Sequence, residues 1–137
     1  MTQTITSQRP FEAQRDEASP NGNLTPGTTV LDDAERLAVG GCRWSDLAKR
    51  YGTPLYVLDE ATLRSTCRAY RTALERHYSG PSLPVYASKA NSSLVMSSIA
   101  ASEGFGLDAV SAGELLTALR GGMPGERMVL HGNNKSD

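Results

Sequence analysis

The sequence has few of the residues that a nucleic-acid or membrane surface needs. Aromatic residues make up 6% of the chain, and 14 basic against 15 acidic side chains leave a net charge of -1. Nucleic-acid-binding surfaces combine a basic field with stacking aromatics, so this composition argues against one. No run approaches the ~20 apolar residues of a membrane span. The N-terminus also lacks the basic-then-apolar order of a secretory signal.

Cysteine is also scarce. The two cysteines, Cys42 and Cys67, lie far apart, and neither has a His or Cys at the spacing of a metal site. This pattern predicts neither a disulfide nor a bound metal, and it suits a reducing compartment. We therefore expect a cytoplasmic protein without a nucleic-acid or membrane partner.

The beginning of the chain carries little periodic signal. Residues 1–27 are polar and rich in Thr, Ser, Gln, Asn and Pro, which predicts disorder. After them, the apolar pair Val30 and Leu31 allows either a short strand or a turn of helix.

One helix and one strand are predicted next. Apolar spacing indicates a helix over 42–51, with Ser45 as a possible N-cap and Gly52 as the stop. Pro54 blocks further helix, and the apolar run 55–58 predicts a strand.

A long amphipathic helix should follow, capped by Asp59 and ended by Ser-Gly-Pro at 79–81. One face is apolar at steps of three and four, comprising Leu63, Cys67, Tyr70, Leu74 and Tyr78. Four arginines fall largely off that stripe: Arg64, Arg68, Arg71 and Arg76. We interpret them as a solvated helix face rather than a phosphate site.

Three strand-and-helix units complete the chain, with strands expected at 83–87, 107–110 and 128–131. Ser92 or Ser93 should open the first helix, which should end at Gly104 and bury Leu94, Val95, Ile99 and Ala100. The second helix opens with the Ser-x-x-Glu spacing of a capping box, at Ser111 and Glu114. It should carry Leu115, Leu116, Ala118 and Leu119 and stop at Gly121 and Gly122.

This order predicts an α/β fold with a parallel sheet and right-handed crossovers. Two architectures fit: a doubly wound open sheet and an eight-fold barrel. A full barrel takes ~250 residues, so a chain of 137 residues would hold only its first units. We therefore expect a fragment.

Lys89 is the leading candidate for chemistry, because it follows a buried strand directly. At the rim of a parallel sheet, near helix ends and apolar walls, an amine can lose its proton and attack a carbonyl. The alternative is an ordinary surface lysine in a loop.

The other candidates are acidic or lie near the same rim. Asp108 interrupts an apolar strand and would need a partner such as Lys89, unless it faces solvent at a turn. Glu114 fits a capping carboxylate better than a catalyst. His131 ends the third strand and could face the rim or be structural, while Lys135 is interpreted as exposed loop. The glycines at 121, 122 and 125 lack phosphate-loop spacing and indicate a helix stop and a turn.

Four ordered motifs carry a resemblance to a known family: 52–57 (GTPLYV), 86–91 (YASKAN), 106–115 (GLDAVSAGEL) and 131–136 (HGNNKS). The chain from about residue 40 onward resembles the N-terminal part of the fold-type III pyridoxal-phosphate decarboxylases. The lysine motif is shared with the alanine racemases and with small pyridoxal-phosphate homeostasis proteins. The last two motifs narrow the resemblance to the bacterial diaminopimelate decarboxylases.

The resemblance implies a TIM barrel of the alanine racemase kind and a C-terminal β domain that this chain lacks. Residues 28–58 would pack with that domain, and residues 59–137 would form an incomplete cofactor-binding barrel. Lys89 would hold pyridoxal 5'-phosphate, Ala87 would lie against it, and Asp108 and Glu114 would line the same rim.

The implied reaction converts meso-2,6-diaminopimelate to L-lysine and CO2, the last step of lysine synthesis, in a homodimer. The family's remaining site residues would lie beyond Asp137, so the chain alone is expected to be inactive. Three alternatives stay open: a related decarboxylase of ornithine, arginine or a carboxylated polyamine, a non-enzymatic pyridoxal-phosphate carrier, and a gene remnant.

Overall fold

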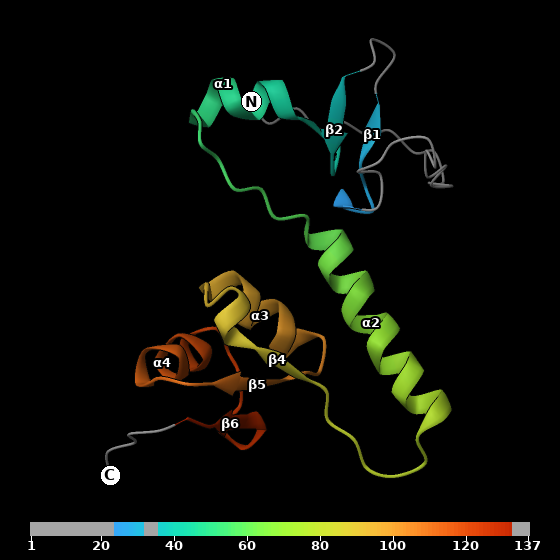
Figure 1. Cartoon of the computed structure of the whole chain (residues 1–137), viewed down its shortest axis with the longest axis vertical. Coiled ribbons are helices and arrows are strands. Elements are labelled where there is room, and N and C mark those ends of the chain that lie inside the picture. Colours follow the sequence, from blue (N-terminus) through green and yellow to red (C-terminus); the bar gives the residue numbers. More distant parts are fainter. Residues whose placement is uncertain (1–23, 32–35, 133–137) are drawn as a thin grey trace. The chain divides into compact units, whose positions relative to one another are not determined.

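The computed structural model describes residues 24–31 and 36–132 (Figure 1). The chain divides into two compact units, Met1–Thr62 and Leu63–Asp137, which are described separately. The predicted disorder of residues 1–27 lies largely outside the described residues. Among those described, no helix has the length and apolar character to span a membrane.

The first unit contains a small antiparallel sheet, of which the sequence predicted only the possible short strand at Val30 and Leu31. It comprises β1 (Val30–Leu31), β2 (Leu37–Val39) and β3 (Cys42–Arg43), paired in that order. Gly40 and Gly41 form the two-residue turn from β2 to β3, with φ of 56° and 78°. Two successive positive φ angles are the requirement of a type I′ hairpin turn, which glycine meets without strain.

Helix α1 (Trp44–Tyr51) confirms the predicted helix with one correction. It starts two residues late because Cys42 and Arg43 pair in β3. Ser45 is therefore inside the helix and is not its cap; Arg43 occupies the N-cap, and its side chain makes no capping hydrogen bond. Gly52 ends the helix as predicted, with φ of 82° and its amide donating to the Ala48 carbonyl.

The strand predicted at 55–58 is wrong: this run belongs to neither a helix nor a strand. Its four apolar side chains are 40–98% exposed. A strand needs a neighbour to bond its backbone groups, and none of the described strands pairs with this run.

Asp59 caps helix α2 (Glu60–His77), as predicted. Its carboxylate accepts hydrogen bonds from the hydroxyls of Thr62 and Thr28, the latter at 2.7 Å. Burial works to raise the pKa of Asp59, but these bonds and the amides of Ala61 and Thr62 outweigh it and lower the pKa.

The second unit is built on a parallel sheet of β4 (Val85–Ala87), β5 (Gly106–Ala109) and β6 (Met128–Leu130), in that order. Helix α3 (Leu94–Ser102) connects β4 to β5, and α4 (Ala112–Arg120) connects β5 to β6. Figure 1 shows both helices on one side of the sheet. The predicted alternation of parallel strands and helices is confirmed.

The core lies between the sheet and these helices. Leu107 and Ala109 are fully buried and pack with Ala100, Phe105, Ala118 and Met123. Helix α3 buries Met96, Ser97, Ile99 and Ala100, so the predicted burial of Leu94 and Val95 is wrong; they are 51% and 47% exposed. The predicted apolar stripe began at Leu94, whereas the buried stripe begins at Met96. Because each residue turns a helix by about 100°, a shift of one or two positions moves a side chain from the buried face to the exposed face.

The face of the sheet that points away from the two helices carries the side chains of Ala87, Asp108 and Val129. Ala87 and Asp108 are direct partners in the β4–β5 ladder, and Asp108 pairs with Val129 in the next. Directly paired residues share a face, opposite to the alternate residues Leu107 and Ala109. Val129 is 50% exposed, so this face is open within the described unit.

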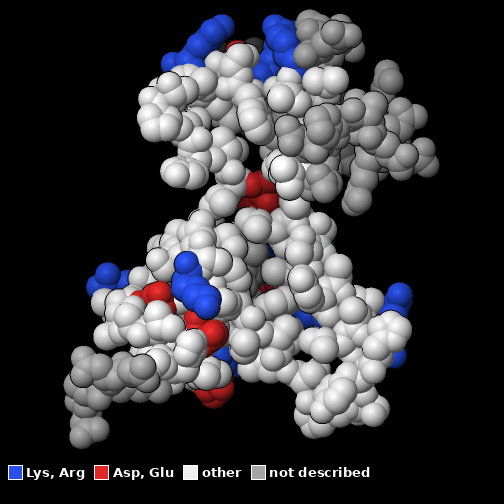
Figure 2. Space-filling model, viewed as in Figure 1, with Lys and Arg blue, Asp and Glu red and all other residues white. Residues whose placement is uncertain are grey.

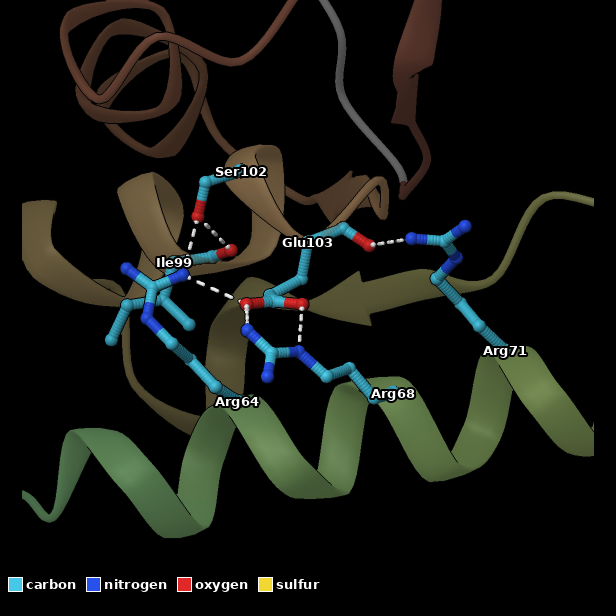
Figure 3. A network of polar contacts seen from close by, with 6 residues as sticks. All are labelled: Arg64, Arg68, Arg71, Ile99, Ser102 and Glu103. Carbon is cyan, nitrogen blue, oxygen red and sulfur yellow. Dashed lines mark hydrogen bonds and ion pairs between the residues drawn. The ribbon is translucent and has the colours of Figure 1, made fainter.

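The arginine face of α2 is not simply solvated, which corrects the interpretation above. Arg64 and Arg68 bond the Glu103 carboxylate, and Arg71 donates to the Glu103 carbonyl at 3.1 Å (Figure 3). Glu103 is 6% exposed, and the bonds from Arg68 and then Arg64 hold its pKa at about 2. The arginines therefore fasten α2 to the C-terminal end of α3.

Charged side chains are dispersed on the face seen in Figure 2, where basic and acidic groups are interspersed on a mostly uncharged surface.

Candidate functional site

The candidate site lies where β4, β5 and β6 end. Parallel strands bring their carboxyl ends to one edge, which is where α/β folds place ligands. Three segments leave this edge: the 3₁₀ turn Ser88–Ala90, the Val110–Ser111 turn into α4, and His131 after β6.

Lys89 is exposed in the 3₁₀ turn Ser88–Ala90, and hydrogen bonds hold the chain directly after this turn, at Asn91. The Tyr86 hydroxyl donates to the Asn91 carbonyl at 3.1 Å, and the Asn91 side-chain oxygen accepts from the Ser93 amide at 3.0 Å. Burial raises the pKa of Tyr86, which keeps its hydroxyl protonated and able to donate. The Lys89 side chain is exposed, and no hydrogen bond or ion pair joins it to the described residues.

Glu114 forms the predicted capping box. Its amide donates to the Ser111 hydroxyl at 3.3 Å, and its carboxylate accepts from the Val110 amide at 2.7 Å. Its pKa is lowered, first by the Ser88 hydroxyl and next by the Val110 amide. Ser88 is 2% exposed, and its Oγ makes no hydrogen bond of regular geometry with the described residues.

Asp108 pairs with His131 and not with Lys89, which corrects the predicted partner. His131 Nε2 lies 3.0 Å from each carboxylate oxygen, and the bond to Oδ2 has hydrogen-bond geometry. Oδ1 is buried and makes no hydrogen bond to the described part of the chain. The Asp108 side chain is 25% exposed on this open face of the sheet.

Of the predicted site residues, two lie within the paired strands and two lie after them. Ala87 and Asp108 are paired across β4 and β5, and Lys89 and Glu114 follow the same two strand ends. Lys135 lies outside the described residues. Sequence reasoning missed Ser88, whose position beside Lys89 in the 86–91 motif was the available signal.

A surface pocket lies elsewhere in this unit. It is lined by Arg71, Leu74, Glu75, Ser82, Pro84 and Gly104. Pro84 and Gly104 precede β4 and β5, so the pocket is at the amino ends of these strands, opposite to Lys89. Within residues 24–31 and 36–132, no cluster of three His, Cys, Asp or Glu side chains could hold a metal ion.

Residues 60–137 match the family model of the pyridoxal-dependent decarboxylases, specifically the pyridoxal-binding domain. The chain belongs to the pyridoxal-dependent decarboxylase family. The predicted family and cofactor class are therefore confirmed.

Relatives of this chain include two diaminopimelate decarboxylases. It is 44% identical over 126 residues to the diaminopimelate decarboxylase of Synechocystis sp., covering 86% of this chain and 27% of the relative. It is 45% identical over 111 residues to the diaminopimelate decarboxylase of Bacillus subtilis, covering 80% of this chain and 25% of that relative. The chain thus spans about a quarter of the length of these relatives.

Solved structures extend the likeness to three dimensions. The diaminopimelate decarboxylase of M. jannaschii superposes with a TM-score of 0.73 at 35% identity, over 80% of this chain and 26% of that one. The same enzyme has been solved in complex with L-lysine, with equal similarity. The barrel alternative is therefore confirmed over the doubly wound sheet, with this chain supplying only part of the barrel.

Proposed function

We propose that this chain supplies the lysine-bearing part of a decarboxylase that converts meso-2,6-diaminopimelate to L-lysine and CO2. One observation carries the proposal: Lys89 follows β4 directly at the sheet edge, and Asp108 and Glu114 belong to the adjacent strand end. An amine with hydrogen-bonded carboxylates on the neighbouring strand and helix suits an enzyme that holds an aldehyde cofactor and binds a cationic amino acid.

The edge fits pyridoxal phosphate chemically. The Lys89 side chain is exposed and would hold the cofactor's aldehyde, while Ser88 Oγ and Asp108 Oδ1 are buried polar atoms that make no bond of regular hydrogen-bond geometry with the described residues. Buried polar atoms are normally paired, so unpaired ones at a strand end indicate capacity for a polar ligand.

Each residue then has a separate task. Lys89 would hold the cofactor through its amine and, once displaced by the substrate's amine, could carry a proton. Asp108 would supply negative charge at the edge, and the small side chain of Ala87 beside it would leave room for the ring. Glu114 would hold the turn between β5 and α4. When bound, pyridoxal phosphate supplies an electron sink for the pair left as CO2 departs.

The same proposal covers the rest of the family architecture. Residues 28–58 would pack with a C-terminal β domain, and residues 59–137 would form part of the barrel. The active protein would be a cytoplasmic homodimer in which both subunits complete each site.

Covalent labelling tests the cofactor assignment. The chain has only three lysines, Lys49, Lys89 and Lys135. The native gene product, made at its own length, would be incubated with pyridoxal phosphate, reduced with borohydride and mapped by peptide mass. We expect the phosphopyridoxyl group on Lys89, and Lys49→Arg serves as the matched control for Lys89→Arg. Equal labelling of all three lysines would refute the assignment.

Substrate choice needs a second measurement. CO2 release from meso-diaminopimelate, ornithine and arginine would be compared in the same preparation, after its intact mass is measured. Preference for diaminopimelate is expected. Preference for ornithine or arginine would favour the related decarboxylases, and Lys89 labelling without CO2 release would favour a non-enzymatic carrier. A product of 14.7 kDa should release none, because it would lack most of the barrel.

A further inference from the structure

His131 has a contact that the proposed function does not use. Its ring follows β6 and bonds the carboxylate of Asp108 on β5 at 3.0 Å, and its own backbone amide donates to the Ala109 carbonyl at 3.0 Å. The ring is thus anchored to the strand beside it by main chain and side chain together.

The direction of the side-chain bond follows from the acceptor. An ionised carboxylate offers only acceptors, so Nε2 must carry the proton that is shared with Asp108 Oδ2. Nε2 lies 3.0 Å from both oxygens, and Oδ1 is the one whose contact lacks hydrogen-bond geometry.

His131 also influences the second carboxylate of the edge. After the Ser88 hydroxyl and the Val110 amide, the charge of His131 contributes to the lowered pKa of Glu114. The ring after β6 therefore acts on the carboxylates of both Asp108 and Glu114, although β6 lies two strands away from β4, which Lys89 follows.

We propose that His131 is a positioning residue of this site: its Nε2–H fixes the Asp108 carboxylate and directs Oδ1 as acceptor for an N–H donor at the edge. The inference rests on the proposed function, because it assigns His131 to the same site. A carboxylate held by a neighbour loses less freedom when it engages a ligand, and a displacement of about 1 Å can cost a hundredfold in rate.

The test compares three variants of the native gene product. His131→Leu removes the donor, His131→Gln keeps an N–H near the position of Nε2, and His77→Leu changes the chain's other histidine, on α2, as the matched control. Far-UV circular dichroism confirms that each variant folds, and His131→Gln keeps the question answerable if His131→Leu does not.

Three readouts are taken together: borohydride labelling of Lys89, the absorption spectrum of the bound cofactor, and kcat with KM. We expect His131→Leu to keep its label on Lys89, shift the spectrum and lower kcat by about ten- to a hundredfold with a smaller change in KM. His131→Gln should restore most of the wild-type spectrum and most of kcat. His77→Leu should match the wild type.

The outcomes separate the two proposals. Failure of wild-type Lys89 to label would overturn the proposed function, and the inference with it. Intact labelling with an unchanged spectrum and kcat in His131→Leu would overturn the inference alone. Equal defects in His131→Leu and His131→Gln would also overturn it, since they would show that the N–H donor is not what matters.

Discussion

The guanidinium of Arg68 donates two parallel hydrogen bonds to the carboxylate of Glu103, Nε to Oε2 and Nη2 to Oε1, each 3.0 Å long. Such fork-to-fork pairs are the strongest geometry for this ion pair. Arg64 adds a third bond to Oε1 at 2.9 Å. Glu103 also closes α3, so a single carboxylate links two helices that are distant in the sequence.

Acid should weaken this link in a defined window. The pKa of Glu103 falls from 4.5 to about 2 in the folded chain, so the stability it contributes is complete above pH 4.5 and is lost as the pH falls toward 2. Glu103→Gln should remove that part of the pH dependence in urea unfolding measured between pH 2 and 6. Glu75→Gln, at a site whose side chain is 66% exposed, is the control. An identical pH profile for Glu103→Gln and wild type would contradict the role of the link.

Gly106→Ala should disrupt the start of β5. A Cβ at this position would come within 2.4 Å of the Arg127 carbonyl oxygen, a backbone atom that cannot move alone. We expect a loss of about 1–3 kcal/mol in the free energy of unfolding, and faster amide exchange across β5 and β6. Gly125→Ala meets nothing within 4 Å and should leave both unchanged. Comparable losses in the two variants would show that the close approach is unimportant.

Leu107→Ala should be among the most destabilising changes in the second unit. Leu107 is 0% exposed and packs in the core beneath α3 and α4. Truncating it should cost about 2–5 kcal/mol, visible as a lower urea midpoint by circular dichroism. Leu119→Ala removes the same atoms from a side chain that is 53% exposed and should cost far less. The prediction is wrong if the two midpoints agree.

Two serine N-caps provide a matched pair. The Ser111 hydroxyl accepts the Glu114 amide, whereas the Ser93 hydroxyl of α3 makes no capping bond and is buried without a partner among the described residues. Ser111→Ala should therefore cost about 0.5–2 kcal/mol, while Ser93→Ala should be neutral or slightly stabilising. Thermal unfolding of both variants measures the difference. Greater destabilisation by Ser93→Ala would reverse the assignment.

Local signals in the sequence determined the parallel strands, the stops at Gly52 and Gly104, and the caps at Asp59 and Ser111. Each depends on backbone chemistry within a few residues, so it can be interpreted without the fold. The placement of Lys89 at a strand's carboxyl end belongs to this group, because it needs only the end of an apolar run and the start of a helix.

Tertiary structure alone decided the partners. Asp108 binds His131, 23 residues away, because β5 and β6 lie side by side, and Lys89 is left without that carboxylate. Glu103 accepts hydrogen bonds from arginines 32 to 39 residues away in the sequence. The arginine face of α2, which was expected to be solvated, therefore links α2 to α3. The run 55–58 had strand composition but found no neighbour among the described strands. A sequence specifies which groups a side chain can bond, but only the packing of strands and helices brings a particular pair within 3 Å.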